Sequence, residues 1–91
     1  MKAKQNDWVA SVGSAFDRPQ IGRVREVHFD GTLDIALYSH RGTKIGRESP
    51  ALNGPRGYEP CCSPENWEVI AEPDFKFIAD KGFWGRYLQR L

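Results

Sequence analysis

The stretch IGRVREVHFDGTLDIALYS, residues 21–39, decides the fold of this chain. Two segments with alternating apolar and polar residues, Ile21–Phe29 and Thr32–Ser39, flank the dipeptide Asp30-Gly31. Strict alternation is typical of a β-strand with one buried face. An Asp-Gly pair between two such segments is a strong hairpin signal, because glycine accepts the positive φ of a tight turn. The stretch therefore predicts an antiparallel hairpin.

The register of this hairpin predicts an irregularity in its first strand. A two-residue loop places Val24 on the face of the second strand's apolar residues but sends Val27 to the opposite face. A three-residue loop places Val27 beside Leu33 and sends Val24 away. A β-bulge near Arg25-Glu26 turns both valines inward. Bulged and strongly bent strands are what a small closed barrel requires.

The remaining sequence predicts two more strands, a helical turn and long loops. One predicted strand precedes the hairpin and another follows it. The helical turn comes just before the last strand, because Ser63 is a good N-cap and Pro64 is favoured in the first position of a helical turn. Glycine and proline mark the loops. The predicted elements are a strand at Asp7–Val12, a loop at Gly13–Gln20, a loop at His40–Pro60 with a short strand inside it at Thr43–Arg47, a helical turn at Ser63–Asn66 and a strand at Trp67–Ile70.

The C-terminal segment, Phe75–Leu91, is rich in aromatic residues at helical spacing. Glycine weakens a helix interior, so we expect a break near Lys81-Gly82 and a firmer helix from Phe83. Its aromatic residues either pack back over the open end of the sheet or form a subunit interface, where aromatic residues and Arg are enriched. The candidate interface residues for a homo-oligomer are Phe83, Trp84, Tyr87 and Leu88.

The order of these elements resembles that of SH3-like barrels, in which a one-turn helix precedes the last strand. The resemblance is to the broad group that includes Tudor-like and KOW-like modules, and it covers roughly residues 6–71. It implies a mostly β fold, a small SH3-like barrel with a short C-terminal helix, in a single domain over residues 1–91 with an aromatic extension at 74–91. For function it implies only a small binding module, because a fold does not fix a function. The residues that carry it are Gly22–Val27, Asp30-Gly31, Leu33–Leu37 and Ser63–Ile70.

Composition excludes several classes of protein. The chain of 91 residues holds three Trp, three Tyr and five Phe, too many for a disordered chain. It has no apolar run near the roughly 20 residues that span a membrane, so we expect no membrane partner. The polar start, Met1–Asp7, does not have the pattern of a signal peptide, and a cytoplasmic location is expected.

Charge is unevenly distributed along the chain, although its net value is only +1. Residues 18–56 are basic, residues 57–80 acidic and residues 81–91 basic. A basic loop beside an exposed aromatic ring is how small barrels bind single-stranded nucleic acid. A solvated face with scattered ion pairs is the other interpretation of the same charges. The candidate ligand-binding residues are Arg23, Arg25, Tyr38, Arg41, Lys44 and Arg47.

The two cysteines, Cys61 and Cys62, are adjacent. A disulfide between neighbours is strained, so we expect two free thiols, one packed inward and one facing the surface. No Cys-x-x-Cys motif is present, and we expect no metal site or cofactor from the sequence. A thiol or metal role of the pair is a distant alternative, and His28 is expected to be an exposed polar residue rather than a base.

Taken together, the sequence favours a non-enzymatic binding or adaptor module. The first hypothesis is that it binds a protein through the loop at 40–60 and the hairpin edge. The alternative is that it binds nucleic acid through its basic loop and hairpin. Catalysis has little support, because no phosphate-binding loop, metalloprotease motif or nucleophile elbow is present.

Overall fold

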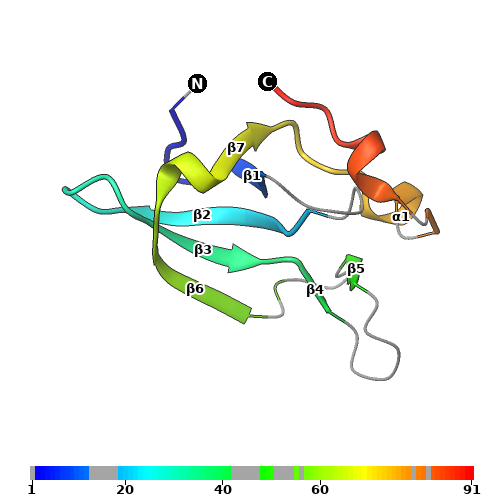
Figure 1. Ribbon diagram of the computed structural model, residues 1–91, viewed down its shortest axis with the longest axis horizontal. Coiled ribbons are helices and arrows are strands. Elements are labelled where there is room, and N and C mark those ends of the chain that lie inside the picture. The colour runs from blue at the N-terminus through cyan, green and yellow to red at the C-terminus, as the bar shows by residue number, and fades with distance from the viewer. Residues whose placement is uncertain are drawn as a thin grey trace.

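The computed structural model describes residues 2–12, 19–41, 48–50, 55, 57–78, 80–81 and 83–91, with the backbone alone at 39–41 and 48–50. Over these residues the fold is mostly β, with one five-stranded antiparallel sheet, a two-stranded ribbon and one short α-helix (Figure 1). The elements in chain order are β1 Trp8–Ser11, β2 Ile21–Val27, β3 Leu33–Leu37, β4 Ser39–Arg41, β5 Glu48–Pro50, β6 Gly57–Cys62, the 3-10 turn η1 Pro64–Asn66, β7 Trp67–Ile70, α1 Phe75–Ile78 and the 3-10 turn η2 Trp84–Tyr87.

The large sheet has the strand order β6-β3-β2-β1-β7. The last strand, β7, lies beside the first, β1, and each neighbouring pair is antiparallel. The strands predicted at Asp7–Val12 and Trp67–Ile70 and the helical turn before β7 are confirmed, whereas the short strand predicted at Thr43–Arg47 lies outside the described residues. In the described part of the chain the edge strands β6 and β7 are not paired with each other, so the sheet is not closed by hydrogen bonds.

The β2–β3 hairpin turns through the three residues Phe29-Asp30-Gly31. The N–H of His28 donates to the carbonyl of Thr32, and Gly31 has a φ of 90°, a value that glycine adopts without strain. The Asp30 carboxylate accepts hydrogen bonds from both the N–H and the hydroxyl of Thr32. This side chain therefore holds the loop in its tight conformation, as Asp does in many turns.

The predicted bulge in β2 is confirmed. The pairing with β3 shifts between Val24 and Glu26, so that Val24 lies opposite Ile35 and Val27 lies opposite Leu33. Val24 is buried, as expected. Val27 lies opposite the buried Leu33, on the inward side as expected, but it remains 41% exposed.

The expectation of a loop up to Pro60 is wrong over residues 57–60, which belong to the edge strand β6 along β3. Proline is tolerated there because an edge strand has one unpaired side. The register between β3 and β6 also shifts, between Leu33 and Ile35. Two residues of β6, Pro60 and Cys61, thus stand opposite the single residue Asp34.

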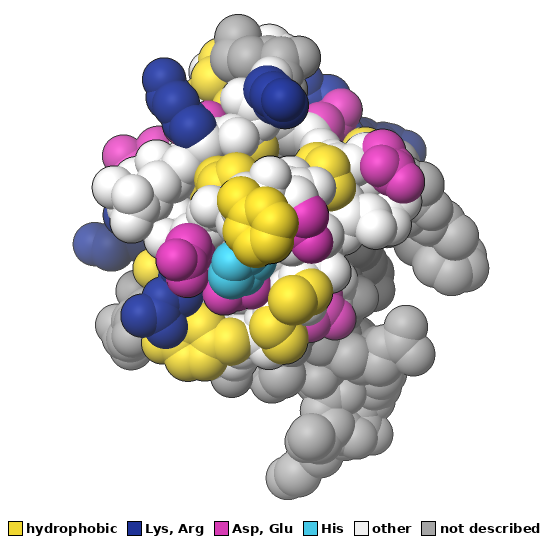
Figure 2. Space-filling view, turned by 90° about the vertical axis from the view of Figure 1, so that its left-hand side faces the viewer, with side chains coloured by type: hydrophobic (Ala, Val, Ile, Leu, Met, Phe, Trp, Pro, Cys, Tyr) yellow, Lys and Arg dark blue, Asp and Glu magenta, His cyan; other side chains and the backbone are white. Residues whose placement is uncertain are grey.

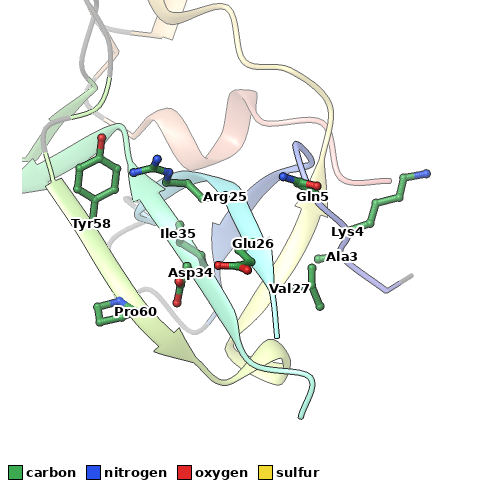
Figure 3. Close-up of a pocket in the computed structure, with 10 residues that line it drawn as sticks. All are labelled: Ala3, Lys4, Gln5, Arg25, Glu26, Val27, Asp34, Ile35, Tyr58 and Pro60. Atoms are coloured by element: carbon green, nitrogen blue, oxygen red, sulfur yellow. The ribbon is translucent and has the colours of Figure 1, made fainter. Parts of the chain in front are cut away.

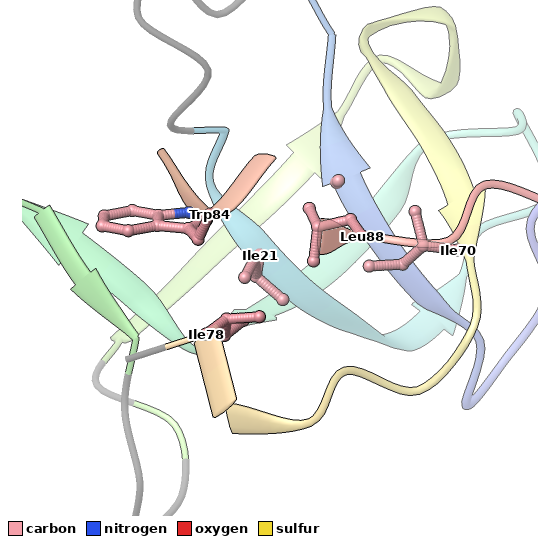
Figure 4. Packing of buried hydrophobic residues seen from close by; sticks show 6 residues of the cluster. Ile21, Ile70, Ile78, Trp84 and Leu88 are labelled. Atoms are coloured by element: carbon pink, nitrogen blue, oxygen red, sulfur yellow. The ribbon is translucent and has the colours of Figure 1, made fainter. Parts of the chain in front are cut away.

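The sheet has an apolar cluster on each face. One cluster contains Val9, Val24 and Ile35, which are fully or almost fully buried. The other is covered by α1 and η2, at the opposite end of the sheet from the hairpin loop (Figures 1 and 4). Its indole, Trp84, donates a hydrogen bond from Nε1 to the carbonyl of Pro19 at 3.2 Å. The buried members of this cluster are Ala10, Ile21, Ile70, Ile78, Trp84 and Leu88.

The C-terminal segment therefore packs back on the sheet, but it is not the expected helix from Phe83. The residues Trp84–Tyr87 form one 3-10 turn, and the α-helix is the earlier turn Phe75–Ile78, where the Asp74 carboxylate accepts a hydrogen bond from the N–H of Phe77. Two of the four candidate interface residues, Trp84 and Leu88, are buried in the chain's own core and offer little surface to a second subunit.

Both outer edges of the sheet are covered or irregular. The last residues run along β7: Ala71 donates its N–H to Gln89, Leu91 donates to Val69, and Arg90 pairs with the Glu68 carboxylate. On the other edge, β6 carries a proline and a bulge. Both devices are known to blunt sheet edges against strand addition.

Gly22 tests the packing of the core. A Cβ at this position would lie 2.3 Å from Cγ2 of the fully buried Ile35. We expect Gly22→Ala to lower the free energy of unfolding by about 1–3 kcal/mol, because overpacking forces the core apart. The matched control is Gly57→Ala, where an added Cβ would meet no atom of the described residues within 4 Å besides those of its chain neighbours, and stability should change little. Urea denaturation of both variants measures this, and equal stabilities would contradict the packing described.

A substitution of Trp84 tests whether the C-terminal segment packs on the cluster of Ile21 and Ile70. Because it is 3% exposed and hydrogen-bonded, Trp84→Ala should destabilise the chain by about 3–5 kcal/mol. Phe83, its neighbour, is 45% exposed, and Phe83→Ala should change stability by less than about 1 kcal/mol. Thermal and urea unfolding measure the difference, and a larger loss for Phe83 than for Trp84 would refute this arrangement.

Candidate functional site

The hairpin end of the sheet presents a face of mixed chemistry to solvent, which we call the hairpin face. Figure 2 shows hydrophobic, basic, acidic and histidine side chains meeting on this end of the molecule. The face follows from the two bulges, which bring successive side chains of β2 and β6 to the side of β3 that carries Asp34. Its residues are Arg25, Glu26, His28, Asp34, Tyr58 and Cys61.

Asp34 lies at the centre of the hairpin face. Its Oδ1 accepts a hydrogen bond from the N–H of Cys61 at 3.0 Å and lies 2.9 Å from Nε2 of His28. The Cys61 N–H, followed by His28, holds the pKa of this carboxyl below its ordinary value. The carboxylate thus takes the place of a ladder partner for the bulged residue of β6.

His28 stands beside this carboxylate rather than free in solvent. The approach of Asp34, with smaller contributions from Glu26 and Asp30, raises the pKa of His28 above 6.5. The Nε2 atom is shielded from solvent, yet it makes no well-aligned hydrogen bond despite the short distance to Asp34. The histidine is partly exposed, but its role on this face was not foreseen from the sequence.

The two cysteines have different environments, as the sequence predicted. Both thiols are free; Cys61 is exposed, and Cys62 packs against the core cluster of Val9 and Ile35. Burial, and next the nearby Glu59 carboxylate, raise the pKa of the Cys62 thiol to about 11. Cys62 therefore stays protonated at neutral pH.

A groove of about 880 Å³ runs along the hairpin face (Figure 3). Its far wall is the N-terminal segment, which is held on β2 because Asn6 donates its N–H to the Val24 carbonyl and Val24 donates to that of Asp7. Figure 3 shows Tyr58 and Arg25 at one end of the groove and Lys4 and Val27 toward the other. The groove is lined by Ala3, Lys4, Gln5, Arg25, Glu26, Val27, Asp34, Ile35, Tyr58 and Pro60.

Two of the predicted ligand-binding residues are engaged within the chain. Arg23 donates from Nε to the carbonyl of Asn6 and lies 5.1 Å from the ring of Trp8. Arg25 lies 4.6 Å from the ring of Tyr58, which is 59% exposed. Among the described residues, the exposed aromatic side chain beside a predicted arginine is therefore Tyr58, a residue the sequence analysis had not singled out.

Tyr38, another predicted ligand-binding residue, lines a small pocket together with Arg23 and Arg25, and its ring also belongs to an aromatic trio. Its ring lies 4.7 Å from that of Trp8 and 5.7 Å from that of Phe75, and the latter two rings are 5.6 Å apart. These are distances of rings in direct contact, and they leave no room for a cation between them. The trio therefore anchors α1 on the sheet.

Most of the predicted basic loop, residues 42–47, lies outside the described residues. Lys44 and Arg47 lie outside the described residues, and of Arg41 only the backbone, in β4, is described. The sequence analysis missed Tyr58, His28 and Cys61 as neighbours, because the edge strand β6 was interpreted as a loop. The register of the hairpin also places Glu26 directly opposite Asp34.

The His28–Asp34 pair predicts a pH dependence. The pKa of His28 is raised in the folded chain, so its contribution to stability is present below about 6.5, the unfolded value, and is lost as the pH rises through the folded value. Asp34, whose pKa is lowered, contributes above its ordinary value and loses this contribution on acidification.

NMR titration of the histidine ring in chelator-treated protein measures this effect. We expect the pKa of His28 above 6.5, and a fall toward that value in Asp34→Asn, which keeps an oxygen for the Cys61 N–H. The variant His28→Asn assigns the resonance. A wild-type pKa at or below 6.5, or no response to Asp34→Asn, would show that the two side chains do not interact in solution.

No helix among the described residues is long and apolar enough to cross a membrane. Comparisons of the chain with protein-family models, with curated proteins and with solved structures found no match.

Proposed function

We propose that this chain is a small protein-binding module that holds an extended peptide segment in the groove of the hairpin face. The groove joins the hairpin edge to the end of the 40–60 segment, the two regions expected to bind a protein. The observation that carries the proposal is the exposed pair of Tyr58 and Arg25 at one end of a groove of about 880 Å³. Tyrosine and arginine are enriched where interfaces gain most of their binding energy.

The mode of binding follows from the edge strand. Pro60 has no N–H, and Cys61 has a φ of 54° and gives its own N–H to Asp34. A peptide therefore does not extend the ladder along this part of β6. We infer that it lies across the side chains instead, with one apolar residue on Tyr58 and another on Val27 toward the other end of the groove, and with polar groups near Arg25 and Glu26.

The proposal includes the SH3-like fold. The order β6-β3-β2-β1-β7, with a 3-10 turn before the last strand and two bulges that bend the sheet, supports this assignment. Closure of the barrel stays a prediction, as do the non-enzymatic role, the cytoplasmic location and association of copies through Phe83 and Tyr87, which are each 45% exposed.

A nucleic-acid-binding role is the second candidate, and one observation favours it. The stacked Arg25 and Tyr58 offer a charge for a phosphate and a ring for a base on the same surface. Two acidic residues of the same groove, Glu26 and Asp34, oppose a polyanion. This balance of charges makes the peptide the better-supported ligand.

Selection from a displayed random peptide library against the full chain tests the proposal. For a selected peptide, Tyr58→Ala should weaken binding by more than about tenfold in fluorescence polarisation, because it removes the anchor ring. The matched control is Phe29→Ala: Phe29 is fully exposed at the hairpin loop and outside the groove, and its loss should change the Kd by less than about twofold.

Two outcomes would overturn the peptide proposal. One is a selected peptide that binds Tyr58→Ala and the parent chain equally well. The other is tight binding of a single-stranded oligonucleotide that falls steeply with salt and is lost in Arg25→Glu, because such binding is electrostatic and would support the second candidate.

A further inference from the structure

We propose that His28, Asp34 and Cys61 form a binding site for one divalent transition-metal ion, best suited to Zn²⁺, on the hairpin face. Each residue offers a different ligand atom, an imidazole nitrogen, a carboxylate oxygen and a thiol sulfur, and all three atoms lie within 4.8 Å of one another. They come from three places in the fold: the end of β2, the middle of β3 and the bulge of β6. The site shares Asp34 with the lining of the groove, but the inference does not depend on the peptide contacts proposed above.

The type of ligand selects the metal. Zinc is bound in proteins by these same three kinds of atom, at about 2.0–2.3 Å from the ion. Calcium and magnesium take oxygen ligands almost exclusively, so a site with one oxygen, one nitrogen and one sulfur disfavours them. Three protein ligands around a tetrahedral ion leave one position open, and on this exposed face water can fill it.

The local geometry supplies what metal ligands need besides proximity. The Asp34 carboxylate already accepts the N–H of Cys61, the kind of outer contact that fixes a ligating carboxylate. The Nε2 atom of His28 is shielded from solvent and lacks a well-aligned hydrogen-bond partner. An ion among the three groups would satisfy that nitrogen and neutralise the carboxylate, and the exposed Cys61 gives it a route of entry.

A catalytic cysteine-histidine-aspartate arrangement fits the same residues less well. In such an arrangement the carboxylate holds one ring nitrogen and the thiol contacts the other. Here the carboxylate lies 2.9 Å from Nε2 of His28, and one ligand atom from each of the three residues lies within 4.8 Å of the other two. The three groups therefore form a compact cluster, which suits a shared ion.

Titration of the chelator-treated, reduced full chain with Co²⁺ tests the proposal, because Co²⁺ replaces Zn²⁺ and reports thiolate ligation by its absorption. We expect one Co²⁺ per chain at micromolar concentration, a sulfur-to-cobalt charge-transfer band and displacement by Zn²⁺. Cys61→Ser should abolish the band and weaken binding by at least about tenfold. His28→Asn should weaken binding without removing the thiolate band at saturating metal.

Cys62→Ser is the matched control, since Cys62 is adjacent in sequence but packs against the core. It should keep the band and the affinity, and circular dichroism checks that each variant folds. The proposal is overturned by a Cys61→Ser chain that binds Co²⁺ as the parent does. It is equally overturned by loss of binding in Cys62→Ser, or by a stoichiometry of one ion per two chains, which would assign the ligands to a contact between copies.

Discussion

The structure depends on two irregularities that flank one residue of the central hairpin. β3 is regular, but the strand on either side of it carries an extra residue at the level of Asp34, at Arg25 in β2 and at Pro60-Cys61 in β6. Bulges sharpen the twist of a strand and re-aim its side chains. Without them, Val24 could not face the core while Glu26 and Asp34 lie opposite each other, and Cys61 would not meet Asp34.

This double irregularity places unlike groups close together. Glu26 and Asp34 are opposite each other, a pairing of like charges that is unfavourable across a hairpin. The Arg25 guanidinium offsets it, as does His28 when its ring is protonated, and both residues lower the pKa of Asp34. His28 and Arg25, which offset this repulsion, also contribute a ligand atom and a groove residue, respectively. The two bulges therefore shape both the fold and the candidate site.

Much of the fold could be predicted from the sequence, because its signals are local. Alternation fixed the strands around Asp30-Gly31, and the mismatch of Val24 and Val27 with β3 predicted the bulge. The site could not be predicted in the same way. Tyr58, Pro60 and Cys61 lie among residues typical of loops, and only their pairing with β3, a contact between distant parts of the chain, makes them a strand. The helical spacing after Phe75 reflected contact with Ile21 and Ile70 rather than a long helix.

The two edges of the sheet determine how readily native molecules associate by strand addition at high concentration. Exposed strand edges are templates on which further chains add and grow into fibrils. Here the end of the chain, through Gln89 and Leu91, occupies the outer side of β7, and Pro60 with the turned Cys61 interrupts β6. Strand addition to the native sheet is thereby obstructed at both edges. The protection of β7 depends on the hydrogen bonds that the segment of Gln89 and Leu91 makes with Val69 and Ala71.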